Sequence, residues 1–184
     1  MAHGLGLVLG IDVGGSTTKI VGLDKAGECK GMLQVDASDQ VTSALGAFGK
    51  FIATYNLRIS DINKIVLTGV GASYLEGGIY DIPTTRLDEF IAIGLGGLKM
   101  AALPSAIIAS VGTGTAIVRA TPDGIRHLGG SGVGGGTLRG LAERFAGMHS
   151  FASLTTLAEK GDLSQIDLRL GDISREKIGN LPAD

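Results

Sequence analysis

The sequence is poor in the residues that build disulfide frameworks, base-stacking surfaces and basic patches. It has one cysteine, Cys29, which excludes an internal disulfide and a cysteine-rich metal site. It has no tryptophan and only 4% aromatic residues, so a stacking platform for nucleic-acid bases is not expected. The 16 Lys and Arg residues are balanced by 18 Asp and Glu residues, which gives a net charge of −2. We therefore expect no nucleic-acid partner and a reducing, cytoplasmic location.

Long apolar runs are also lacking. Residues 90–111 are mostly apolar, but Lys99 and Pro104 divide them into runs shorter than the ~20 residues of a membrane span. The first residues contain neither a basic leader nor a signal-type cleavage region. We expect a buried helix followed by a buried strand in this region, and no membrane association.

Glycine is present in excess, at 31 of 184 residues, against a usual share of ~7%. Three glycine-rich runs stand out, at residues 14–18, 112–115 and 134–136. The first two lie between short apolar runs, which predicts a strand, a tight turn and a second strand in each case. The predicted strands are 7–11 and 20–23 around the first turn, and 106–111 and 116–120 around the second.

An internal repeat connects these two hairpins. Asp12 to Thr18 aligns with Ser110 to Ala116, with Val, Gly and Thr in matching places at an offset of 98 residues. This spacing exceeds the 20–50 residues of solenoid repeats. We therefore expect two related lobes, each beginning with a strand, a glycine turn and a strand.

The remaining chain predicts further strands and helices. Thr85 to Asp88 has a capping-box pattern that predicts the start of a helix ending near Met100. Thr137 is expected to cap a helix that follows a glycine-rich loop at 129–136. The other predicted elements are strands at 29–35, 64–70 and 125–128, and helices from Ser38 or Asp39 to about Tyr55, from 137 to about 146, and at 151–160.

The glycine turns have a chemical interpretation. A phosphate chain is bound by several backbone N–H groups that converge at close range, which side chains would obstruct. The third run also precedes a helix N-terminus, where the helix dipole favours anions. The alternative is that these glycines serve tight hairpins and close strand contacts. Because two of the turns hold equivalent places in two related segments, we favour phosphate binding.

Asp12 ends a buried apolar strand beside the first turn, where an unpartnered carboxylate is costly. A hydrated Mg²⁺ that bridges phosphates is a suitable partner, because Mg²⁺ keeps several waters and takes one or two carboxylates. The alternative is a turn residue that accepts nearby N–H groups. Lys19 is either a point charge for a phosphate or an exposed strand lysine.

Glu89 lies in the first turn of the helix expected after Thr85. One interpretation is an acid that complements the helix dipole, a role that Asp88 also fits. The other is a general base that takes the proton of a substrate hydroxyl during phosphoryl transfer. The helix position lowers the pKa of Glu89 and burial raises it, so the residues alone leave both interpretations open.

Other common site motifs are absent or weak. There is no Walker-type phosphate loop, and the three histidines lack metal-ligand spacing. Residues 130–135 match G-x-G-x-x-G, but two predicted helices follow instead of a strand–helix–strand unit, so a dinucleotide fold is not expected.

Four segments together resemble the type II (eukaryotic-like) pantothenate kinases, in family order from Leu7 onward: GIDVGGSTTKIV, SVGTGTAIV, LGGSGVGGGTLRGL and LAEKGD. The resemblance implies an α/β fold of the two-lobed actin-like ATPase (ribonuclease H-like) type. It also implies ATP-dependent phosphorylation of pantothenate on its terminal hydroxyl, the first step of coenzyme A biosynthesis. Mg²⁺ and a homodimer are implied as well.

The resemblance assigns roles residue by residue. Asp12 matches the acid of the first phosphate loop, which we take as the metal ligand, and Glu89 matches the catalytic base. His127 stands where many members carry an arginine that contacts pantothenate, and we place Thr113 on the substrate side with it. The positions assigned to nucleotide binding are Gly14, Gly15, Ser16, Thr17, Lys19, Gly112, Thr113, Gly114, Thr115, Gly134, Gly135 and Gly136.

We predict a first lobe at residues 1–104 and the start of a second lobe at 105–184. Family chains continue past the equivalent of Asp184, so the second lobe is expected to be incomplete. The main prediction is a pantothenate kinase. Ala116 stands where members often have serine, and two alternatives stay open. One is a truncated, non-catalytic module that binds nucleotide or coenzyme A, and the other is a kinase for another hydroxylated small molecule, such as a sugar.

Overall fold

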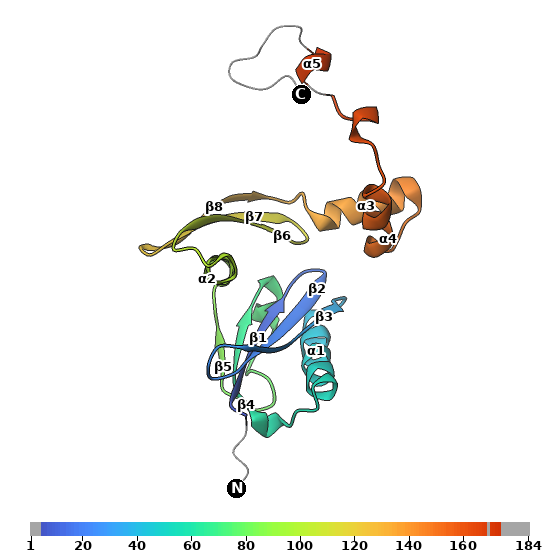
Figure 1. Ribbon diagram of the computed structural model, residues 1–184. Helices are drawn as coiled ribbons and strands as arrows, with labels where there is room; N and C mark the ends of the chain where they lie inside the picture. Colours follow the sequence, from blue (N-terminus) through green and yellow to red (C-terminus); the bar gives the residue numbers. More distant parts are fainter. Residues whose placement is uncertain (1–4, 169, 174–184) are drawn as a thin grey trace. The chain divides into compact units, whose positions relative to one another are not determined.

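The computed structural model describes residues 5–168 and 170–173, and the chain forms two compact units, Met1–Leu138 and Arg139–Asp184. The first unit contains two β-sheets and the helices α1 and α2 (Figure 1). The predicted lobe boundary at 104/105 falls inside the first unit, between the strands of the two sheets. It stays a prediction.

The first sheet has five strands in the order β3-β2-β1-β4-β5. β1 pairs antiparallel with β2 and parallel with β4, and β4 pairs parallel with β5. The apolar runs expected to form strands in this region do so, with boundaries that differ by a few residues. The bounds are β1 Leu7–Val13, β2 Thr17–Leu23, β3 Cys29–Asp36, β4 Ile62–Thr68 and β5 Thr84–Arg86.

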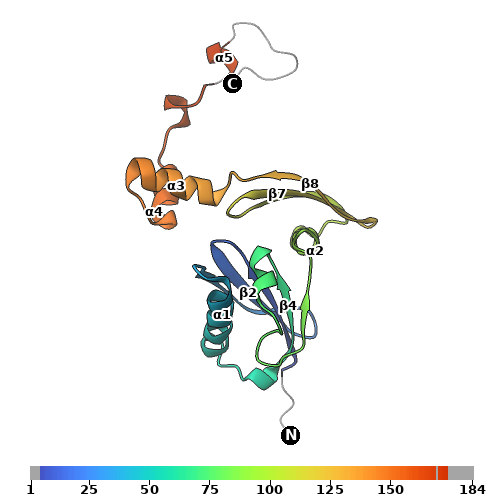
Figure 2. The same cartoon turned by 180° about the vertical axis from the view of Figure 1, so that it is seen from behind.

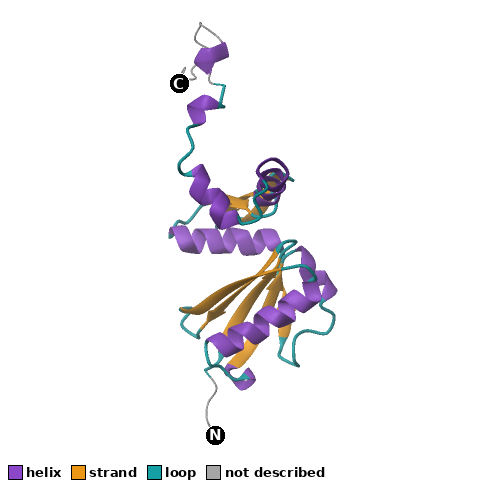
Figure 3. Cartoon of the chain, turned by 90° about the vertical axis from the view of Figure 1, so that its right-hand side faces the viewer, coloured by secondary structure: helices purple, strands orange, loops and turns teal. Residues whose placement is uncertain are grey.

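Helix α1 (Gln40–Thr54) covers one face of this sheet (Figure 3). Its start follows the sequence prediction, because the Asp39 side chain accepts a hydrogen bond of 2.7 Å from the backbone N–H of Thr42. Phe48 and Phe51 of the helix are buried in one apolar cluster with Leu9 and the other inward-facing strand residues. This core holds β1 and its following turn in place.

The second sheet is an antiparallel meander of β6 (Ala106–Val111), β7 (Thr115–Thr121) and β8 (Gly124–Ser131). Helix α2 (Glu89–Ala101) packs against one face of it (Figures 1 and 2). The packing is close because a Cβ on Gly97 would lie 2.6 Å from the side chain of Ile108. Alternate residues of the sheet, including Ile107 and Val111, stay exposed.

The two sheets begin with equivalent hairpins. β2 starts at Thr17 and ends at Leu23, and β7 starts at Thr115 and ends at Thr121, an offset of 98 residues at both ends. In each hairpin a glycine turn joins antiparallel strands. The repeat found in the sequence is therefore confirmed as a structural repeat.

The sequence prediction was wrong at two helix starts. Thr85 does not cap a helix; it lies in β5, and α2 begins at Glu89 with Asp88 as its N-cap. Thr137 is not a cap either, because α3 (Gly135–Ala146) begins two residues earlier. The loop expected at 129–136 is shorter than predicted, since β8 continues to Ser131.

The second unit contains most of α3 and the helix α4 (Phe151–Ala158), which confirms the helix expected at 151–160. Two short helices follow, η3 (Leu163–Gln165) and α5 (Leu170–Ile173), and two others lie in the first unit, η1 (Ile59–Asp61) and η2 (Val70–Tyr74). Across the part of the chain that is described, none of the helices has the length and apolar character needed to span a membrane.

Candidate active site

Sheet topology gathers the candidate acids at one edge of the first sheet. β1, β4 and β5 are parallel, so their carboxyl ends lie at the same edge. Asp12 is near the end of β1, and Thr68 ends β4 directly beside it in register. α2 begins three residues after β5 ends, which brings Glu89 to the same edge. In open α/β sheets this edge is where ligands bind.

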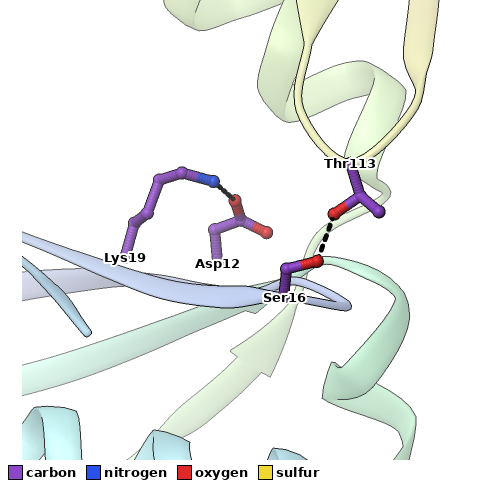
Figure 4. Close-up of polar contacts among 4 residues, drawn as sticks. All are labelled: Asp12, Ser16, Lys19 and Thr113. Carbon is purple, nitrogen blue, oxygen red and sulfur yellow. Dashed lines mark hydrogen bonds and ion pairs between the residues drawn. The ribbon is translucent and has the colours of Figure 1, made fainter. Parts of the chain in front are cut away.

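The two repeated turns meet at this edge. The hydroxyl oxygens of Ser16, from the first turn, and Thr113, from the second, are 2.9 Å apart and share a hydrogen bond (Figure 4). The residues are 97 positions apart in the sequence. The two turns are therefore in direct contact through their side chains.

The first turn is tight. The N–H of Gly14 donates a hydrogen bond of 3.0 Å to the carbonyl of Thr17. A Cβ on Gly14 would lie 2.7 Å from that same oxygen, so a side chain would open the turn. Gly15 is exposed and has open space around it. The turn thus presents bare backbone to solvent, as a phosphate-binding loop requires.

The triple glycine supports the second turn. The N–H groups of Gly135 and Gly136 donate hydrogen bonds of 2.8 and 3.0 Å to the carbonyls of Gly112 and Thr113. A Cβ on Gly134 would lie 2.7–2.8 Å from backbone atoms of Gly114. In this structure the three glycines therefore hold the second turn in shape, and their assignment to nucleotide binding stays a prediction.

Asp12 and Lys19 form an ion pair across the first hairpin. Lys19 Nζ lies 3.0 Å from Asp12 Oδ2, and the two side chains are 50% and 35% exposed (Figure 4). Gly69, at φ +88°, makes room for the other carboxylate oxygen, because a Cβ there would overlap Asp12 Oδ1. The Asp12 carboxylate is thus accessible from solvent and already faces a cation.

This arrangement fits the chemistry of a hydrated Mg²⁺. Among the described residues, no group of three or more His, Cys, Asp or Glu side chains forms a metal cage. Mg²⁺ bound with nucleotide does not need one, since it takes one or two carboxylates and completes its shell with water and phosphate oxygens. The accessible carboxylate of Asp12, near the two glycine turns, meets that requirement.

Glu89 is half-buried in the first turn of α2. Asp88 fixes this turn by accepting hydrogen bonds of 2.9 and 3.1 Å from the N–H groups of Phe90 and Ile91. Burial raises the pKa of Glu89, the negative charges of Asp12 and Asp88 raise it further, and Lys19 opposes the shift. A carboxylate with a raised pKa is a better proton acceptor, which favours the general-base interpretation.

His127, from β8, contacts the first turn of α2. Its ring stacks on that of Phe90, with centroids 4.0 Å apart and planes at 10°. Phe90 directly follows Glu89 in α2. The predicted substrate residue therefore contacts the helix that carries the predicted base.

Sequence reasoning missed Thr68 and Gly69. The buried hydroxyl of Thr68 has no hydrogen-bond partner among the described residues and belongs to the residue paired with Asp12. Gly69 accommodates the Asp12 carboxylate. The sequence feature that could have indicated them is a Thr-Gly pair near the end of a buried apolar run. The first predicted strand is likewise followed by a polar residue and, shortly after it, by glycine.

The chain is similar to known proteins in its sequence and in its fold. A family model described as Fumble matches residues 99–182. The type II pantothenate kinase of Staphylococcus aureus (strain USA300) is 32% identical in an alignment of 182 residues that covers 96% of this chain. The chain is a relative of the type II pantothenate kinases. It spans 63% of the length of that relative.

Solved structures assign this pantothenate kinase relative to the actin-like ATPase fold, which confirms the predicted fold class. Component A of (R)-2-hydroxyglutaryl-CoA dehydratase from Acidaminococcus fermentans has a TM-score of 0.66 and 15% identity, with 85% of this chain and 60% of that chain covered. The activator of 2-hydroxyisocaproyl-CoA dehydratase from Clostridium difficile, with bound ADPNP, has a TM-score of 0.59 and 18% identity, covering 95% and 59%. At these identities the likeness concerns the fold alone.

Proposed function

We propose that this chain carries the catalytic edge of an ATP-dependent pantothenate kinase, which forms 4′-phosphopantothenate in the first step of coenzyme A biosynthesis. The observation that carries the proposal is the contact between Ser16 and Thr113, which brings two glycine turns together beside Asp12 and Glu89. The 32% identity to a type II pantothenate kinase supports the choice of substrate.

In this proposal the two glycine turns bind the phosphates of ATP. The backbone N–H groups of Gly14 and Gly112 donate within their own turns. Other backbone N–H groups of the first turn (residues 14–17) and the second turn (residues 112–115) would donate hydrogen bonds to the phosphate oxygens of ATP from two sides. The Ser16 and Thr113 hydroxyls are hydrogen-bonded to each other in this structure. A phosphate that enters between them would replace this hydrogen bond with one to each hydroxyl. Such fixed donors stabilise the charge that spreads over the transferring phosphoryl group.

Glu89 acts as the general base that accepts the hydroxyl proton of pantothenate. The terminal hydroxyl oxygen of pantothenate attacks the γ-phosphorus, and the bond from that phosphorus to the β,γ-bridging oxygen breaks, so ADP leaves. The hydroxyl proton passes to the Glu89 carboxylate. His127, whose ring stacks on Phe90 of the same helix, would contact the acceptor.

Asp12 would hold Mg²⁺ together with the nucleotide, and the ion would offset phosphate charge. Lys19 forms an ion pair with Asp12 in this structure. When Asp12 binds Mg²⁺, the Lys19 ammonium group would contact a phosphate instead. We extend the proposal to a homodimer, which rests on the resemblance, and to a cytoplasmic location, which rests on the single cysteine.

The test is phosphate transfer measured directly. The chain is incubated with Mg²⁺ and ATP labelled in the γ-phosphate, and product is followed for pantothenate and for a panel of sugars. We expect label in pantothenate and none in the sugars. Label in a sugar and none in pantothenate would contradict the pantothenate assignment and favour a sugar kinase. Nucleotide binding by calorimetry without transfer to any acceptor would favour the non-catalytic module.

A further inference from the structure

A cavity lies at the end of the first sheet opposite the glycine turns. It has a volume of about 480 Å³, within the ~300–1,000 Å³ range of small-molecule sites. The C-terminal end of α1 and the turn between β2 and β3 form its sides. None of its lining residues belongs to the candidate active site. The lining residues are Leu5, Leu7, Asp24, Lys25, Ala26, Lys30, Phe51, Tyr55 and Leu57.

The walls of the cavity are apolar and fixed. Leu7 and Phe51 belong to the buried core. The Tyr55 hydroxyl accepts a hydrogen bond of 3.0 Å from the N–H of Met32 and donates one of 2.8 Å to its carbonyl. The Tyr55 ring lies against Gly31, where a Cβ would overlap it. The hydroxyl is therefore held by the backbone of Met32, and the ring presents its apolar surface to the cavity.

Three charged side chains lie at the rim of the cavity, and two of them, Asp24 and Lys30, form an ion pair. Asp24 Oδ1 accepts hydrogen bonds of 2.8 and 3.0 Å from the N–H groups of Ala26 and Glu28, and its Oδ2 lies 2.9 Å from Lys30 Nζ. These partners lower the pKa of Asp24, with the hydrogen bond from Lys30 as the largest cause. Asp24 and Lys30 thus satisfy each other. Lys25 has no hydrogen-bond or ion-pair partner among the described residues.

The Lys25 side chain lies over Gly6. Gly6 has φ +66°, and the position that a Cβ would take there is 2.5 Å from Lys25 Cε. The aliphatic stem of Lys25 therefore lies across bare backbone at the start of β1. An apolar chamber with a single free ammonium group at its mouth is complementary to an apolar chain that ends in one negative charge.

We propose that this cavity binds a medium-chain aliphatic monocarboxylate, with the hydrocarbon chain against Phe51, Tyr55 and Leu57 and the carboxylate at Lys25. The inference is independent of the proposed kinase function, because the cavity shares no residue with that site.

The experiment compares octanoate with octan-1-ol by calorimetry on the full 184-residue chain. The two probes have the same chain length and differ in charge. Replacing Lys25 by Met keeps an apolar stem and removes the ammonium group. We expect Lys25→Met to reduce the affinity for octanoate relative to octanol by about fivefold, the value of one exposed ion pair. Lys160→Met, which changes an exposed lysine of the second unit, should leave the ratio unchanged.

Two further measurements locate the site. Affinity should rise from hexanoate to octanoate by up to about fourfold for each added methylene, because each is buried from water. Leu57→Trp, which fills the chamber, should abolish binding of both probes while thermal unfolding confirms the fold. The proposal is overturned if Lys25→Met leaves the octanoate-to-octanol ratio unchanged, or if Leu57→Trp binds octanoate as tightly as the parent chain.

Discussion

Replacing Glu89 by Gln is expected to lower phosphoryl transfer to pantothenate by about 10²–10⁴-fold, the usual contribution of a positioned general base. Gln has nearly the same shape, but its amide takes up no proton. The fold should be retained, because the substitution removes a half-buried charge whose pKa burial and Asp12 already raise. Initial rates at saturating ATP and pantothenate give the turnover, and thermal unfolding checks the fold.

Glu76→Gln is the matched control, since Glu76 is an exposed glutamate of the same unit with no hydrogen-bond or ion-pair partner among the described residues. The pH dependence adds a second readout. Below its raised pKa, Glu89 is protonated and cannot accept the hydroxyl proton, so turnover of the parent chain should fall as pH falls through that value. The Gln variant should lack this acidic limb. Near-normal turnover in Glu89→Gln would remove Glu89 from the mechanism.

The second large effect is expected from Gly134→Ala. The new Cβ would lie 2.7–2.8 Å from three backbone atoms of Gly114, distances that side-chain carbons do not tolerate, so the second turn must shift. We expect a loss of about 1–3 kcal/mol in the free energy of unfolding, as for other overpacked sites. Nucleotide affinity should fall at least tenfold, because the displaced amides no longer converge on the phosphates.

Gly132→Ala is the control for this substitution. Gly132 is in the same glycine-rich segment, yet a Cβ there would meet nothing within 4 Å. Its stability and nucleotide affinity should match those of the parent chain. Equal behaviour of the two alanine variants would show that the packing of Gly134 on Gly114 has no part in the site.

The sequence predicted the hairpins well because their determinants are local. The apolar run that predicted β6, residues 106–111, corresponds to the observed strand at both ends. The repeat of Val, Gly and Thr gave the equivalence of the two turns, and the start of β7 at Thr115 follows it. Glycine turns between apolar runs need no distant partner to be recognised.

Elements that depend on distant partners were missed. Thr85 lies in β5 because the N–H of Ile65 donates to the carbonyl of Pro83 and that of Leu87 donates to the carbonyl of Leu67, both at 2.8–2.9 Å. This pairing overrides a local pattern that favours a helix cap. Gly135 begins α3 despite its low helix propensity, since its N–H bonds to Gly112 in another part of the chain.

The candidate site shows the same division. Asp12 and Glu89 were identified from strand ends, helix position and the family resemblance. Their shared electrostatic environment follows only from the parallel order of β1, β4 and β5. The role of Gly69 beside Asp12 depends on a contact between two strands, and no pattern within one strand reveals it.

We propose that both turns bind one triphosphate through their backbone amides. The most direct test is a titration of the ¹⁵N-labelled chain with Mg²⁺ and ADPNP, followed by amide chemical shifts. We predict that the signals of residues 14–17 and 112–115 shift together and saturate with one dissociation constant. Binding that moves the signals of one turn and leaves those of the other unchanged would contradict the claim.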